Sequence, residues 1–201
     1  MAEITAQLVK QIRERTGAGM MDCKSALAEA KGDVAEAELI LRKRGIASAA
    51  KKAARATKQG LIGTYIHPGS QLGVIVEINC ESDFVARTDA FRQLVHDIAM
   101  QVAAADPQFI RREDVTPEAL EREKEIQKAR VMAEGKPEHV AGKIVDGRMH
   151  KYYEEVCLVD QPFIKDNTMT VGQLIATVIA KTGENVTVGR FVRFKVGDAA
   201  E

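Results

Sequence analysis

The stretch LIGTYIHPGSQLGVIVEINCESDF, residues 61–84, decides the fold of this chain because the hydrophobic pattern changes its period there. Residues 61–67 are rich in β-forming side chains, and apolar residues then recur at every second position from Leu72 to Ile78. Pro68-Gly69-Ser70 lies between these two segments and is typical of a tight turn. The pattern predicts a β-hairpin that is followed directly by a short acidic and aromatic segment.

The sequence before the hairpin has helical periodicity instead. Three amphipathic segments are separated by turn signals at residues 16–19, TGAG, and at Gly32. Thr5 is placed to cap the first helix, and Asp33 with Glu36 forms a capping-box-like pair before the third. Three helices in so short a stretch predict a compact helical bundle over residues 1–45.

A basic segment follows the predicted bundle. It covers residues 42–58 and contains seven basic residues and no acidic one. We expect Gly45 to break the helix inside this run, so residues 46–59 are interpreted as a basic helical linker. Residues 1–60 hold 12 basic and 7 acidic residues, whereas residues 61–201 hold 17 and 22. This asymmetry predicts two modules in a chain whose net charge is +0.

Residues 60–201 are predicted to form one α+β domain around the hairpin. After Cys80 the chain returns to helical spacing until Pro107, and Ser82 or Asp83 is the expected cap. The other predicted elements are a charged helical hairpin at about 117–158, a helix that Thr170 and Gln173 cap and Gly183 ends, and a strand over 186–196. Hairpin strands and a final strand packed under helices indicate a small antiparallel sheet.

Metal and disulfide chemistry finds little support in the sequence. Cys23, Cys80 and Cys157 are odd in number, widely spaced and without a CxxC pair, which favours reduced thiols. The four histidines have no paired spacing to each other or to a cysteine: His67, His96, His139 and His150. We therefore expect no metal and no cofactor.

No membrane attachment is expected either. No window approaches the roughly 18 consecutive apolar residues that a membrane span needs. The first residues, MAEITA, lack the basic and then apolar pattern of a secretory leader. These patterns predict a soluble, cytoplasmic protein.

One enzyme class has partial matches in the sequence. Ser48-Ala49-Ala50-Lys51 fits the S-x-x-K motif of serine acyl-transfer enzymes, and Lys181-Thr182-Gly183 fits their K-T-G. Ser48 lies in the basic linker, however, Gly183 looks like a helix stop, and Ser82-Asp83-Phe84 lacks the asparagine of the third motif. A phosphate-binding P-loop is also missing, because Gly135-Lys136 is followed by proline. The chain is predicted not to be an enzyme.

The alternative function is that of a basic accessory protein that binds RNA or the ribosome. Lys51, Lys52 and Arg55 in the linker could contact phosphates. The run has no interleaved aromatic side chain on which bases could stack. We favour a solvated helix over direct nucleic-acid contact.

Two features do not fit an ordinary fold. Met21 lies roughly 100° away from the helical stripe of Met20, Cys23 and Leu27, so it is expected to face a partner. Asp83-Phe84 joins an acidic cap to a bulky aromatic at the start of a helix. Physical reasoning alone favours Phe84 as a core residue, since large aromatics are mostly buried.

Two long stretches resemble a known family. TGAGMMDCK at residues 16–24 and NCESDFVAR at residues 79–87 are similar to the signatures of elongation factor Ts. The likeness continues through GRM at 147–149, QPF at 161–163 and RFVRF at 190–194, so it covers essentially the whole chain. Membership of this family would make the protein a non-enzymatic exchange factor.

The resemblance implies a set of contacts with the GTPase elongation factor Tu. It implies that residues 1–45 form a ubiquitin-associated-like domain and that both this domain and the core touch the GTPase. The implied contact residues of the N-terminal domain are Arg13, Met20, Met21 and Lys24. The implied wedge, which displaces Mg²⁺ and loosens the phosphate contacts of GDP so that GTP can replace it, is Ser82, Asp83, Phe84 and Val85.

Two departures from the family pattern stand out. Ser82 replaces an expected threonine, and both residue types can cap a helix through a hydroxyl group. The chain also resembles the short form of the family, with one core subdomain. A homodimer that uses the apolar strand over residues 186–196 could supply the missing contacts.

Overall fold

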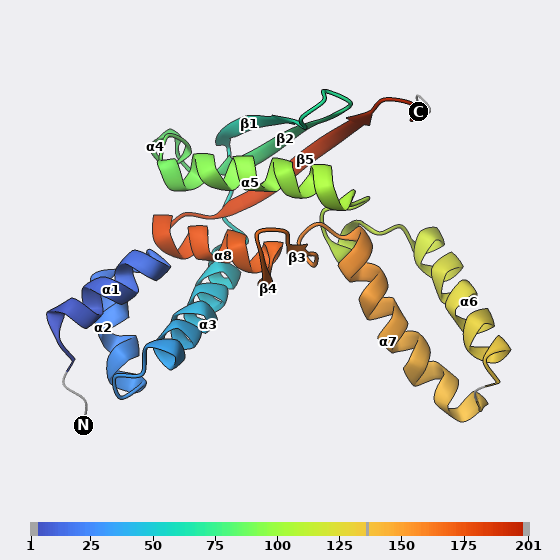
Figure 1. Ribbon diagram of the computed structural model, residues 1–201, viewed down its shortest axis with the longest axis horizontal. Helices are drawn as coiled ribbons and strands as arrows, with labels where there is room; N and C mark the ends of the chain where they lie inside the picture. The colour runs from blue at the N-terminus through green and yellow to red at the C-terminus, as the bar shows by residue number, and fades with distance from the viewer. Residues whose placement is uncertain (1–3, 136, 199–201) are drawn as a thin grey trace. The chain divides into compact units, whose positions relative to one another are not determined.

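The computed structural model describes residues 4–135 and 137–198, apart from the side chains of residues 138 and 139 (Figure 1). The expectations for residues 1–3, for Lys136 and for the side chain of His139 lie outside this description. The chain divides into two compact units. The first contains the described residues up to 63 together with 76–97 and 173–189, and the second contains 64–75, 98–172 and the described residues from 190 onward.

Three helices form the N-terminal bundle of the first unit (Figure 1): α1 (Ala6–Thr16), α2 (Met20–Glu29) and α3 (Val34–Lys52). The Thr5 hydroxyl accepts a hydrogen bond from the backbone N–H of Leu8 at 3.2 Å, and Asp33 accepts one from Glu36 at 2.9 Å. Both predicted caps are thereby confirmed. The bundle core consists of apolar side chains from all three helices, among them Val9, Ile12, Cys23, Leu27, Ile40 and Leu41.

The predicted helix break at Gly45 is wrong. Helix α3 continues without interruption to Lys52, and Gly45 is buried within it. A Cβ placed on Gly45 would lie 3.6 Å from the Cβ of Ala180 in helix α8 (Val171–Thr182). Gly45 therefore allows two helices to pack closely, and the packing compensates for its low helix propensity. The domain boundaries drawn from the sequence stay a prediction.

The main sheet has three strands in the order β1 (Gln59–Ile66), β2 (Leu72–Cys80) and β5 (Val186–Lys195). The hairpin turn is closed by a hydrogen bond from His67 N–H to the carbonyl of Leu72 at 2.9 Å, which confirms the predicted hairpin. The final strand is also confirmed. The alternating residues Val74, Val76 and Ile78 are buried, as their period of two indicated.

The helix predicted after Cys80 is divided into two. Helix α4 (Asp83–Ala86) is a single turn, and the long helix α5 (Asp89–Ala105) starts after it. The Thr88 hydroxyl donates to the carbonyl of Val85 at 2.8 Å and accepts from the N–H of Phe91 at 3.3 Å. Thr88 thus ends one helix and caps the next.

The second unit contains the predicted helical hairpin, formed by α6 (Pro117–Ala133) and α7 (Glu138–Val156) (Figure 1). Thr116 caps α6, whose first residue is proline, a residue type that is favoured at this helical position. The sequence did not predict the 3-10 helix η1 (Arg112–Asp114) or the antiparallel pair β3 (Pro162–Phe163) and β4 (Asp166–Thr170).

Two buried glutamines hold the unpredicted β3 segment in place. The side-chain amide of Gln101 donates to the side-chain oxygen of Gln161 at 3.1 Å and to the Pro162 carbonyl at 3.2 Å. The side-chain oxygen of Gln101 accepts a hydrogen bond from the N–H of Ile164 at 2.9 Å. Buried amides are stable only when they are satisfied in this way.

Alkaline pH is expected to destabilise the fold through its cysteines. Burial raises the pKa of the Cys157 thiol from 9.0 to about 11, and it raises the pKa values of Cys23 and Cys80. The folded state therefore prefers the protonated thiols, and this contribution is complete below pH 9 and is lost as the pH rises toward 11. Urea unfolding at several pH values should show a smaller loss of stability for Cys157→Ala than for the wild type over this range. If the free energy of unfolding fell equally with pH in the wild type and in Cys157→Ala, the prediction would be contradicted.

Candidate functional site

The most unusual surface feature of the first unit is an aromatic side chain in water. Phe84 is 79% exposed, although its neighbours Val85 and Ala86 on the same helical turn are buried. Burying a phenylalanine side chain is worth about 1.5–3 kcal/mol, which this residue does not gain within the chain. The interpretation of Phe84 as a core residue is therefore wrong. Aromatic side chains are enriched among the anchor residues of protein interfaces, so Phe84 is a candidate contact residue.

A serine cap starts the helical turn that carries Phe84. The Ser82 hydroxyl accepts a hydrogen bond from the N–H of Val85 at 3.4 Å, which identifies Ser82 as the cap. Asp83 is the first helical residue, and its carboxylate accepts a hydrogen bond from Arg87 at 2.7 Å. The carboxylate and the aromatic ring of two successive residues are thus presented by one short turn.

A carboxylate from a distant part of the sequence binds this turn. One oxygen of Glu184 accepts hydrogen bonds from the backbone N–H groups of Glu81 at 3.1 Å and Ser82 at 2.9 Å. Its other oxygen accepts a hydrogen bond from the Ser82 hydroxyl at 2.5 Å. Hydrogen bonds to an ionised carboxylate are stronger than those between neutral groups. Glu184 therefore fixes the backbone directly before Phe84.

Glu81 in turn binds the residue that follows Glu184. Its carboxylate accepts a hydrogen bond from the backbone N–H of Asn185 at 2.6 Å, and the guanidinium of Arg55 lies 3.5 Å away from the same oxygen. The Asn185 side chain is only 2% exposed and donates to the carbonyls of Ala53 at 3.3 Å and Arg55 at 2.8 Å. Three chain segments are joined in this way: residues 53–55, 81–82 and 184–185. We call this set of contacts the carboxylate clamp.

A buried thiol lies under the same turn. Cys80 is fully buried at the end of β2, and its sulfur donates to the carbonyl of Ser82 at 3.1 Å. Burial, and next the nearby charge of Glu184, raise the pKa of this thiol. The cysteine is therefore kept protonated and acts as a hydrogen-bond donor to the turn.

The second group of candidate residues lies on the N-terminal bundle. Met20 and Met21 are 58% and 74% exposed, and Lys24 on the next turn of α2 is also exposed. Met21 faces outward as predicted, but the assignment of Met20 to the core stripe is wrong. Met20 is the first residue of α2 and lies before Cys23, where the buried part of the helix begins. Arg13 is exposed on the preceding helix α1.

The structure thus places the candidates from the sequence in two separate segments, residues 82–85 and residues 13–24. Within residues 82–85, the side chain of Phe84 is exposed and that of Asp83 is half exposed in its ion pair with Arg87, whereas Val85 is buried and anchors the turn. Glu184 and Asn185 were missed. They lie about 100 residues further along the chain, directly after Gly183, which in the sequence indicated only the end of a helix. No local sequence pattern connects them to Ser82.

The sequence motifs that suggested an acyl-transfer enzyme or a nucleic-acid-binding protein have ordinary structural roles here. The Ser48 hydroxyl accepts from Lys52 at 3.1 Å, one helical turn away on α3. The S-x-x-K motif would require Lys51 instead. Gly183 follows the end of α8 with a φ of +79°, so the K-T-G segment is a helix terminus as predicted. Within the basic run, Arg44 pairs with Glu29 at 2.6 Å and Arg55 contacts Glu81.

Among residues 4–135 and 137–198, no helix is both long and apolar enough to cross a membrane. The same part of the chain contains no group of three or more His, Cys, Asp or Glu side chains arranged to hold a metal ion.

Comparison with known proteins gives a consistent result. Residues 4–198 match the family model described as Elongation factor TS. A relative from Solibacter usitatus named Elongation factor Ts is 73% identical over 99% of this chain and 94% of its own length. Relatives of the same name from Koribacter versatilis and Desulforamulus reducens are 62% and 57% identical, over 98% and 100% of this chain and 90% and 93% of their own lengths.

Proposed function

Since the chain belongs to the elongation factor Ts family and is a translation elongation factor, we propose that it binds the GTPase elongation factor Tu and promotes the exchange of GDP for GTP. The observation that carries the proposal is the exposed Phe84 on a turn that the rest of the first unit holds in place. The protein would act by binding alone, without a covalent step. The GTPase would supply the nucleotide site.

Phe84 is the proposed wedge. Its ring would enter an apolar gap between helices of the GTPase nucleotide domain and bury the surface that it exposes in the free protein. Buried aromatic anchors of this kind dominate the energy of many protein interfaces. Val85 would support the wedge from below, because it is packed into the first unit. Ser82 would set its direction as the helix cap.

Asp83 adds a charge to the wedge. A P-loop GTPase holds its nucleotide through backbone donors, a lysine and Mg²⁺, so a small movement of these ligands weakens several charge-assisted contacts together. The carboxylate of Asp83 would lie near this site and disfavour the bound phosphates. Loss of Mg²⁺ would then leave the phosphate charges unscreened, and GDP would dissociate.

Thermodynamic linkage completes the cycle. Any factor by which the exchange protein lowers nucleotide affinity must equal the factor by which nucleotide lowers the affinity for the exchange protein. Incoming GTP would therefore release the exchange protein from the GTPase. No energy source beyond the difference in nucleotide concentrations is required.

The N-terminal bundle would provide a second contact with the GTPase. Met20 and Met21 offer flexible apolar side chains, and Lys24 and Arg13 offer positive charge on adjacent helices. Residues 1–45 would then serve as the binding domain, residues 46–59 as the basic connection and residues 60–201 as the core that carries the wedge. We place this activity in the cytoplasm, where translation takes place.

The direct test is nucleotide release. Purified protein is mixed with elongation factor Tu that carries fluorescent GDP, and release is followed in an excess of unlabelled nucleotide. We expect release to be much faster than the spontaneous rate and to slow when the protein is diluted. Release at the spontaneous rate over all concentrations would overturn the proposal. RNA binding that weakens with salt and with neutralisation of Lys51 and Lys52 would favour the alternative of a basic accessory protein.

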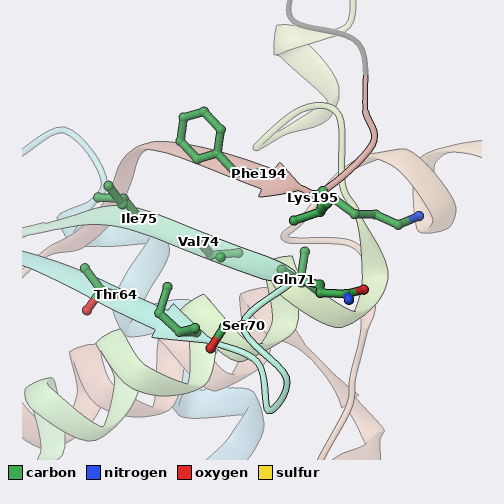
Figure 2. Close-up of a pocket in the computed structure, with 11 residues that line it drawn as sticks. Thr64, Ser70, Gln71, Val74, Ile75, Phe194 and Lys195 are labelled. Carbon is green, nitrogen blue, oxygen red and sulfur yellow. The ribbon is translucent and has the colours of Figure 1, made fainter.

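We also propose a homodimer, formed through the exposed side of the second unit's strands. Side chains of β1, β2 and β5 line a hollow of about 550 Å³ there (Figure 2). Phe194 is 65% exposed beside it, and Ile66, Ile75 and Val196 add further exposed apolar surface. Apolar strands that are exposed in this way tend to pair with another chain. A second copy would cover the surface isologously.

Light scattering tests the homodimer. At micromolar concentration we expect twice the chain mass of 22.0 kDa, and we expect Phe194→Glu to reduce the mass to that of one chain because it would bury a charge in an apolar contact. Nucleotide release by the variant would show whether the dimer is needed for exchange. A wild-type mass of one chain would contradict the prediction.

A further inference from the structure

We propose that Glu184 is a positioning residue for the wedge: it holds the turn of Ser82 and Asp83 so that Phe84 is presented in its binding orientation before the GTPase arrives. This inference rests on the proposed exchange function and extends it to a residue outside the signature motifs. It is carried by the hydrogen bonds of the carboxylate clamp, which belong entirely to the first unit.

The turn needs an external support. Helix α4 has four residues, and so short a helix is not stable by itself, since nucleation costs more than its few hydrogen bonds return. The cap bond from Val85 to Ser82 is long, at 3.4 Å. The three hydrogen bonds to Glu184 are shorter, between 2.5 and 3.1 Å. They fix both the backbone and the side chain of Ser82.

The charges around Glu184 agree with this role. Its carboxylate is only partly exposed, and all three of its donors are backbone or hydroxyl groups of the turn, so its charge is satisfied by the turn itself. Glu81 would repel it, but the carboxylate of Glu81 is occupied by the Asn185 N–H and faces Arg55. Glu184 therefore binds the backbone of residues 81 and 82, and Glu81 binds the backbone of Asn185, so the two acids do not compete for one cation.

The benefit of the clamp is preorganisation. A wedge that is mobile in the free protein has to be ordered during binding, and this lowers the free energy available for displacing the nucleotide. A wedge that is already ordered loses less free energy on binding, so more of its binding energy remains to displace the nucleotide. Removing Glu184 should therefore slow nucleotide release by acting through Phe84, without removing any group that touches the GTPase.

The test combines nucleotide release with amide hydrogen exchange. We expect Glu184→Ala to lower the maximal release rate about tenfold, because hydrogen bonds to a charged group are lost from the turn. Glu184→Gln, which keeps one acceptor oxygen, should be intermediate. The backbone amides of Glu81 and Ser82, followed by NMR, should exchange faster in Glu184→Ala while the amides of the α5 core stay protected.

Asp160→Ala is the matched control. Asp160 is a half-buried carboxylate of the second unit that accepts two hydrogen bonds from Arg112, at 2.7 and 2.9 Å. Its removal should leave release and the amides of Glu81 and Ser82 unchanged. This control separates a general loss of stability from a specific loss of the clamp.

A double-mutant cycle decides between positioning and a general structural role. If Glu184 acts through the wedge, Glu184→Ala should have no further effect on release in a Phe84→Ala background. An additive loss, or an unchanged rate with protected amides in the single variant, would overturn the inference. A wild-type protein that does not accelerate release would overturn the exchange function itself, whereas the amide exchange would still decide whether Glu184 orders the turn.

Discussion

Replacing Phe84 by alanine is expected to remove most of the acceleration of GDP release while leaving the fold intact. The ring is 79% exposed, so its loss should change the free energy of unfolding by less than about 0.5 kcal/mol. Truncating a central aromatic anchor of an interface costs about 2–4 kcal/mol, which corresponds to a roughly 30- to 1000-fold slower release. Stopped-flow release of fluorescent GDP and urea unfolding of the same samples measure both quantities.

The control for this experiment is a second exposed apolar residue. Ile164 lies in the second unit and is partly exposed, and its side chain has no place in the proposed wedge. Ile164→Ala should release GDP at the wild-type rate. If Phe84→Ala also kept the wild-type rate, the wedge would be disproved and the nucleotide would have to be displaced by the N-terminal bundle or by another part of the core.

The largest loss of stability is expected for Gly60→Ala, in the first strand of the sheet. A Cβ on Gly60 would collide with the backbone oxygen of Ile78 and would lie 2.8 Å from the Cα of Asn79. Both atoms belong to the backbone of the paired strand β2, which cannot move without breaking the sheet. We expect the free energy of unfolding to fall by about 3 kcal/mol. Urea unfolding measures this change.

Gly142→Ala is the matched control, because it makes the same chemical change in open space. Gly142 is exposed on helix α7, and no atom lies within 4 Å of a Cβ placed there. Alanine should stabilise this helix by about 0.5–1 kcal/mol. The two substitutions should therefore act with opposite sign. A destabilisation of similar size at both positions would refute the close strand approach at Gly60.

The sequence predicted most elements because their signals are local. The alternation of Leu72 to Ile78 and the caps at Thr5 and Asp33 each depend on residues within one turn or strand, and all are present in the structure. Two of the errors, at Gly45 and Met20, have a tertiary cause. Gly45 is tolerated inside a helix because another helix packs against it, and Met20 is exposed because the bundle core begins one turn later.

The candidate site was only partly predictable. The general rule that large aromatics are buried gave the wrong prediction for Phe84, which is exposed. Only the resemblance to a family assigned this residue to a contact surface. The supporting residues Glu184 and Asn185 could not be found from one sequence. Their contacts with residues 81 and 82 span more than 100 positions, and a glutamate after a helix end is too common to be a signal.

The clamp also sets an order of events during synthesis of the protein. Glu81 of the signature NCESDFVAR is synthesised 103 residues before Glu184, whose carboxylate binds it. A growing chain therefore contains the complete motif before the residue that orders it has been made. The core of the N-terminal bundle comes from its own three helices, so the bundle can form early. A nascent chain would therefore offer a folded bundle and an unsupported turn, and the proposed wedge would be held in place only after helix α8 and residues 184 and 185 have emerged.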